Sequence, residues 1–194
     1  MTLESKGIDM PKELTNFVFN SKYKQIATMV VILFAIIYVP SISHADQEPG
    51  NVVVIKSGNY LHIRGDDKNN SIKITFFKNR DVRVSPIGPK TLINDQHKGV
   101  KVKLKKNERL SVRMNAGHDL IVIDKRSKFP TKLLSIDILL SAGKDAIFSE
   151  CDGIIKLKNH VKIDGGSDKD IVILHKTLFA AHKGVEIKKV EVLE

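Results

Sequence analysis

Residues 164–174 read DGGSDKDIVIL, in which a glycine pair and three acids precede four aliphatic residues. Related turns, with a small residue, glycine, a polar residue and Asp before an apolar segment, occur in MNAGHDLIVID from Met114 and in LSAGKDAIFSE from Leu140. The equivalent acids are Asp119, Asp145 and Asp170, at intervals of 26 and 25 residues. These stretches predict a strand–turn–strand unit that repeats about every 25 residues.

Such a repeat is typical of coils that stack and bury apolar side chains against one another. The second residues after the three acids, Ile121, Ile147 and Val172, are expected to form one row inside the coils. The prediction is an all-β protein with a right-handed parallel β-helix (a solenoid) over residues 105–194. Antiparallel hairpins over residues 46–104 would cap its open end. The alternative is a β-sandwich of hairpins, in which the spacing reflects only two strands and two turns.

The preceding part of the chain alternates apolar and polar residues with period two. Three segments, NVVVIKSGNYLHIRG, SIKITFFKNRDVRVSP and GVKVKLKKNERLSVRMN, each predict two strands and a polar turn. A fourth related turn, RGDDKNNSIKI, carries Asn70 in place of the acid, 49 residues before Asp119 and so close to two periods away. Near the other end, residues 177–184 could hold one short turn of helix.

The first 45 residues have the parts of an export signal. Lys22 and Lys24 precede an uncharged apolar run of fourteen residues, Ile26–Val39, and Pro40 follows. The small residues Ser43 and Ala45 then complete a signal-peptide pattern, with cleavage expected after Ala45. An uncleaved membrane anchor is the alternative, although a spanning helix needs about 20 apolar residues. A helix buried in a cytosolic protein is the third interpretation.

Charge and cysteine content narrow the partners and the chemistry. The formal net charge of +10 favours anionic partners, among which we expect an acidic polysaccharide or an envelope surface rather than a specific nucleic acid. Membrane contact is expected only through the N-terminal segment, if it is uncleaved. Cys151 is the single cysteine, so the chain forms no intramolecular disulfide. Because of the export signal in the first 45 residues, the protein is expected to be secreted, periplasmic or on the cell surface.

The stretch GGSDKDIVI, residues 165–173, resembles the nonapeptide G-G-x-G-x-D-x-U-x of hemolysin-type (RTX) calcium-binding repeats, with Asp168 in place of the third glycine. NAGHDLIVI and SAGKDAIFS look like shortened versions of it. The resemblance implies a β-roll or β-helix whose turns bind calcium. Calcium takes six to eight oxygen ligands. The candidate metal ligands are Asp164, Asp168 and Asp170, joined by Asp145 and Asp119 if the coils stack in register.

Other interpretations of these turns stay open. The acids could be structural and accept backbone N–H bonds at the turns, or two of them could form a catalytic pair. A phosphate-binding loop is excluded because three acids repel phosphate and no helix N-terminus follows. No nucleophile motif occurs, and the histidines lack zinc-ligand spacing.

Three function classes follow from these patterns. The first is a non-enzymatic exported β-solenoid protein with a structural or binding role at the cell envelope and weak calcium binding. The second is a lyase-like enzyme that acts on polysaccharides. The third is an adhesin that binds anionic polymers through a basic sheet face from Lys101 to Arg113.

Overall fold

The computed structural model describes residues 48–77, 80–125, 133–149, 155–157, 159–173, 179–181 and 184–193. All regular elements in these ranges are strands, which confirms the all-β prediction. No helix that could span a membrane occurs in this described part of the chain. The strands are β1 (Gly50–Ser57), β2 (Tyr60–Arg64), β3 (Ser71–Phe76), β4 (Asp81–Pro86), β5 (Thr91–Ile93), β6 (Val100–Lys103), β7 (Arg109–Arg113), β8 (Leu120–Lys125), β9 (Ile136–Leu139), β10 (Ala146–Ser149), β11 (Ile155–Leu157), β12 (Val161–Asp164), β13 (Ile171–Ile173), β14 (Phe179–Ala181), β15 (Val185–Lys188) and β16 (Glu191–Leu193).

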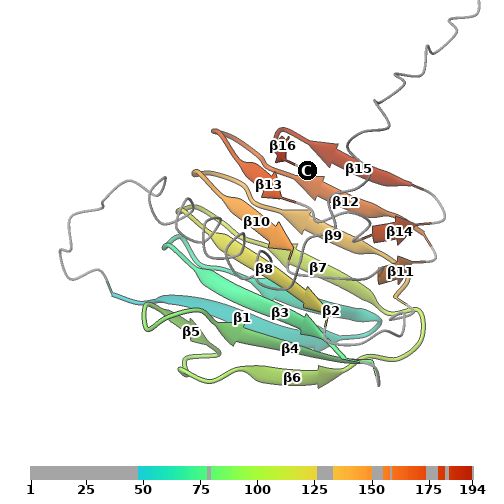
Figure 1. Cartoon of the computed structure of the whole chain (residues 1–194). Helices are drawn as coiled ribbons and strands as arrows, with labels where there is room; N and C mark the ends of the chain where they lie inside the picture. The colour runs from blue at the N-terminus through green and yellow to red at the C-terminus, as the bar shows by residue number, and fades with distance from the viewer. Residues whose placement is uncertain are drawn as a thin grey trace, which may run out of the picture. The chain divides into compact units, whose positions relative to one another are not determined.

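Two mixed seven-stranded sheets contain most of these strands. The first sheet, sheet 1, has the order β15-β12-β9-β7-β2-β1-β5, and the second, sheet 2, has the order β16-β13-β10-β8-β3-β4-β6. Strands β11 and β14 form a separate parallel pair. From β7 onward the chain steps between the two sheets, and each return to a sheet adds a strand parallel to the previous one (Figure 1).

The strand register places equivalent residues of the repeat beside each other. Ile147 pairs with Ile121 on one side and with Val172 on the other, and all three side chains are fully buried. The row predicted from the sequence is therefore confirmed. A matching row in the first sheet contains Ile63, Val112, Ile138 and Ile163. Burial of each such side chain contributes about 1.5–3 kcal/mol relative to leaving it exposed, so these rows are the main source of stability.

Antiparallel pairing is confined to the earlier strands. β1 pairs with β2, and β4 pairs with both β3 and β6, in antiparallel register. β2 and β3 also pair in parallel with β7 and β8, so the antiparallel and parallel parts share these two strands. Two of the three predicted hairpins are confirmed. The third is wrong, because β6 lies in sheet 2 and β7 in sheet 1.

The interval between Asn70 and Asp119 also has a structural explanation. Ser71 pairs directly with Leu120, so the two turns are neighbours although 49 residues separate Asn70 from Asp119. The intervening chain forms β4, β5 and β6 instead of a further turn of the repeat. The short helix expected over residues 177–184 is also wrong, since Phe179–Ala181 is strand β14. The proposed signal segment, residues 1–45, and Cys151 lie outside the described residues.

Candidate functional site

The four related turns have the same length and stack on one another. Each has six residues between strands that pair in register: 65–70, 114–119, 140–145 and 165–170. The expectation that two of them are shortened is therefore wrong. Gly143 has φ of 128°, and a Cβ atom there would lie 1.7 Å from the carbonyl oxygen of Gly117 in the neighbouring turn. Glycine thus permits the close approach of successive turns.

The three repeat acids form a ladder of hydrogen bonds between the turns. The Asp119 Oδ1 atom accepts a hydrogen bond from the Asn70 backbone N–H at 2.8 Å. In the same way Asp145 accepts from the Asp119 N–H at 2.8 Å, and Asp170 accepts from the Asp145 N–H at 2.9 Å. We call Asn70, Asp119, Asp145 and Asp170 the carboxyl ladder. Each carboxyl group supplies an acceptor to an N–H of the turn before it, and so fixes the register of the stack.

The ladder is buried and has an unusual charge state. Its four side chains are at most 2% exposed, and Oδ2 of each acid has no hydrogen-bond partner among the described residues. Burial raises the pKa of Asp119 and of Asp145 from 3.8 to about 7, against the lowering effect of the N–H bonds, and neighbouring acids raise these pKa values further. Burial also raises the pKa of Asp170. Asp119 and Asp145 therefore hold their protons through the mildly acidic range.

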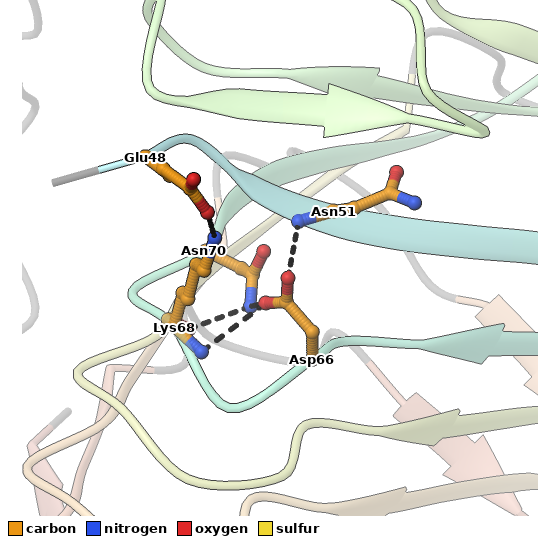
Figure 2. A network of polar contacts seen from close by, with 5 residues as sticks. All are labelled: Glu48, Asn51, Asp66, Lys68 and Asn70. Carbon is orange, nitrogen blue, oxygen red and sulfur yellow. Dashed lines mark hydrogen bonds and ion pairs between the residues drawn. The ribbon is translucent and has the colours of Figure 1, made fainter.

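Asn70 shows how an uncharged amide fits the ladder. Its Nδ2 donates to the Lys68 carbonyl oxygen at 2.7 Å and to Asp66 Oδ1 at 3.0 Å. Asp66 also accepts from the Asn51 N–H at 2.8 Å, which ties the first turn to β1, as Figure 2 shows. Asn70 Nδ2 lies near the Cβ position of Gly65, and Asp170 Oδ2 lies near the equivalent position of Gly165. An amide nitrogen at an Asp position would therefore replace the unpartnered oxygen.

This comparison predicts the effect of two substitutions at Asp145. Asp145→Asn removes a buried negative charge and keeps the Oδ1 acceptor, so the variant is expected to unfold at a higher urea concentration than the native chain at pH 8. At pH 5, where Asp145 is protonated, the two are expected to be similar. Asp145→Ala leaves the Asp119 N–H without an acceptor and is expected to lose about 1–3 kcal/mol at pH 5. Urea unfolding followed by circular dichroism measures the stability of the native chain and of both variants at each pH. An Asp145→Asn variant that is less stable than the native chain at pH 8 would contradict a raised pKa of the buried Asp145 carboxyl.

The other two candidate ligands, Asp164 and Asp168, are more exposed and also bind backbone N–H groups. Asp168 Oδ2 accepts from the Gly143 N–H at 3.1 Å, and Asp164 Oδ1 accepts from the Gly166 N–H at 3.1 Å. Asp168 has φ of 72°, a left-handed backbone conformation that is uncommon for a residue other than glycine. It links its own turn to the preceding one.

The five predicted metal ligands do not form one cluster. Among the described residues no group of three or more His, Cys, Asp or Glu side chains is arranged to hold a metal ion. Calcium binding through Asp119, Asp145, Asp164, Asp168 and Asp170 stays a prediction. Since the ladder acids are buried, we expect any calcium binding to depend on Asp164 and Asp168, which calorimetric titration of Asp168→Asn would test.

A second group of candidate residues lies on the outer face of β2 and β7. Their inward residues are buried, so the alternate residues Tyr60, His62 and Arg64 of β2 and Arg109, Ser111 and Arg113 of β7 point outward. We call these six residues the arginine face. The register places Arg109 beside Tyr60 and Arg113 beside Arg64.

Contacts within the arginine face hold its aromatic side chains in place. The Tyr60 and His62 rings stack with centroids 5.3 Å apart. The Arg109 guanidinium lies 5.3 Å from the Tyr60 ring centroid and donates a hydrogen bond to the Tyr60 hydroxyl. Arg64 and Arg113 are exposed and form no ion pair with another described residue. Two unneutralised guanidinium groups on adjacent strands favour an anion between them.

Part of this face could have been found in the sequence. YLHIR and RLSVR share the same alternation and end in arginine, and their alignment would place Arg64 beside Arg113. The predicted basic face from Lys101 to Arg113 is wrong as a single surface, because Lys101 and Lys103 lie on β6 in one sheet and Arg109 and Arg113 lie on β7 in the other. In addition, Lys101 is paired with Asp81 at 2.6 Å.

Comparison of the chain with protein-family models, curated proteins and solved structures found no match.

Proposed function

We propose that this chain is an exported binding protein of the cell envelope that recognises an anionic polysaccharide through the arginine face. The repeated parallel pairing supports a right-handed parallel β-helix as its scaffold, because crossovers between parallel strands of one sheet are nearly always right-handed. The rigid sheet would present the six side chains at fixed strand intervals of about 4.8 Å. The envelope location rests on the N-terminal sequence pattern.

The adjacent exposed pair Arg64 and Arg113 carries this proposal. Guanidinium groups bind carboxylates and sulfates through two parallel hydrogen bonds, which suits the charged groups of acidic sugars. The neighbouring Tyr60 ring already contacts Arg109 and His62, so its faces are less available to stack on a nucleic-acid base. Ser111, between Arg109 and Arg113 on the same face, adds a hydroxyl that can bond to sugar hydroxyls.

Substitution of the arginine pair is expected to weaken binding to heparin and to alginate, a sulfated and a carboxylated polysaccharide. The Arg64→Ala/Arg113→Ala double variant is expected to lose at least about tenfold in affinity, since it removes charge-assisted hydrogen bonds worth about 1.5–3 kcal/mol each. Arg83→Ala is the matched control, because Arg83 is an exposed arginine on β4 of the other sheet. Isothermal calorimetry at two salt concentrations measures both affinity and its screening.

Equal affinity of the double variant and Arg83→Ala would refute the arginine face as the binding site. Tighter binding of single-stranded DNA than of either polysaccharide, with loss in the same double variant, would assign the face to nucleic acid instead. Circular dichroism of each variant checks that the fold is retained, because all three arginines are exposed.

A further inference from the structure

Exposed apolar side chains occur at the end of the stack formed by β15 and β16. Among the described strands, each of these two has a hydrogen-bonded neighbour on one side only. Val185 continues the row of Val161 and Val192 continues the row of Val172, and both of those preceding residues are fully buried. At the end strands, in contrast, Val185 is 45% exposed and Val192 is 42% exposed. Unpaired strand edges next to exposed apolar side chains favour the addition of a further strand.

The opposite end of the stack is closed differently. There the edge strand of sheet 2 is β6, which pairs antiparallel with β4 and carries the exposed lysines Lys101 and Lys103, and the edge strand of sheet 1 is the three-residue β5, which pairs in parallel with β1. Lysines on an edge strand discourage pairing with another chain. The two ends are therefore chemically distinct, and β15 and β16 form the end that is suited to association.

We propose that a second copy of this chain docks on this end, with β15 pairing antiparallel to β15 and β16 to β16 of the partner about one two-fold axis. The inference is independent of the polysaccharide proposal. Directly opposite residues of an antiparallel pair have side chains on the same face of the sheet. The two-fold axis must therefore lie where one residue of β15 faces its own copy, and such an axis is called here an axis through that residue. Glu186, Ile187 and Lys188 are the three choices near the centre of the strand.

The charges on β15 select one of these choices. An axis through Glu186 or Lys188 would place two like charges directly opposite each other, which is destabilising. An axis through Ile187 places each Glu186 opposite Lys188 of the other copy, and it brings the two Ile187 side chains together on the inner face. In the single chain Glu186 and Lys188 are exposed and form an ion pair with each other.

The same axis suits the second sheet. Ile187 continues the row of Ile163, and Val192 continues the row of Val172. Ile163 and Val172 each lie two residues outside the turn at 165–170, so they occupy equivalent places in the two sheets. One axis across the end of the stack can therefore pass through both Ile187 and Val192. A second copy is the occupant whose charges match along β15 and whose apolar residues meet in both sheets.

The test uses charge reversal and a charge swap in the full chain. Sedimentation equilibrium over a range of micromolar concentrations is expected to show a dimer. Glu186→Lys places lysines opposite each other twice and is expected to raise the dissociation constant roughly tenfold. The double variant Glu186→Lys/Lys188→Glu restores both opposite-charge pairs and is expected to recover the native dissociation constant. A native chain that stays monomeric at all concentrations, or a swap that fails to rescue a weakened dimer, would overturn the proposal.

A crosslink tests the position of the axis. In a Cys151→Ser background, Ile187→Cys places two thiols on residues that face each other across the axis. Their Cα atoms would lie about 4.5–5.5 Å apart, within the range that a disulfide spans. Mild oxidation is expected to give a covalent dimer, whereas the control Ile55→Cys, at an exposed position of β1, is expected to give none. Equal crosslinking of both variants would refute this register.

Discussion

The free energy of unfolding is expected to fall as the pH rises from about 4 to about 8. Asp119 and Asp145 have pKa values of about 7 in the folded chain against 3.8 as the ordinary value, and the pKa of Asp170 is raised as well. Because the folded state holds these protons more tightly than the unfolded state, the carboxyl groups stabilise the fold. This stabilisation is fully present at a pH below the unfolded pKa. It is lost as the pH passes through the folded pKa. One pKa unit corresponds to about 1.4 kcal/mol, so the loss amounts to several kcal/mol.

Urea unfolding at intervals between pH 4 and pH 8 measures this effect. The exposed acids Glu48 and Glu186 do not mimic it, since their lysine partners lower their pKa values from 4.5, and any stability they add is lost as the pH falls below about 4.5, which is opposite in sign to the effect of the ladder. The control is Asp145→Asn, which is expected to show a shallower fall over the same range. A native curve that is flat, or that rises towards pH 8, would contradict a protonated ladder.

Gly143→Ala is expected to cause the second large loss of stability. A Cβ atom would lie 1.7 Å from the Gly117 carbonyl oxygen, so the stacked turns would have to separate. The left-handed backbone at φ of 128° adds a cost of roughly 1–3 kcal/mol for a residue with a side chain. Together these effects are expected to lower the free energy of unfolding by more than about 3 kcal/mol.

Gly88→Ala is the matched control for this prediction. Gly88 also has a left-handed φ, of 79°, but a Cβ atom there would meet nothing within 4 Å. The difference between the two variants in urea unfolding therefore isolates the contact between successive turns. Similar losses in both variants would show that backbone strain, and not the close stacking of turns, limits position 143.

The sequence predicts much of the fold because the repeat is local. The interval between Asp119, Asp145 and Asp170 is the length of chain needed to pass through both sheets and return, so equivalent acids and the row of Ile121, Ile147 and Val172 fall into register. The first two hairpins follow from alternation and polar turns. Such features depend on neighbouring residues and a constant spacing, which a sequence displays directly.

Other features depend on which strands meet, and a sequence does not display this. β6 and β7 alternate like a hairpin, but each finds its partner in a different sheet. Asn70 and Asp119 are neighbours because the chain between them leaves the repeat to form three other strands. The acids suggested metal ligands, whereas their contacts in the structure are N–H groups of the preceding turns, and these contacts exist only after stacking.

The arginine face was missed for a similar reason. Tyr60, Arg64, Arg109 and Arg113 come from two strands separated by β3 to β6, so their proximity depends on the parallel pairing of β2 with β7. The net positive charge of the sequence indicated an anionic partner but not the surface that binds it. Only the pairing shows which basic side chains stand together.

Buried carboxyl groups hold the stacked turns together and keep their protons near neutral pH. The most direct measurement is a carbon-13 NMR titration of the Asp119 and Asp145 carboxyl groups in the full chain. The structure predicts pKa values of about 7 for both. Titration of both groups near their ordinary value of 3.8 would contradict the claim, because exposed or charge-paired carboxyls titrate there and a buried ladder does not.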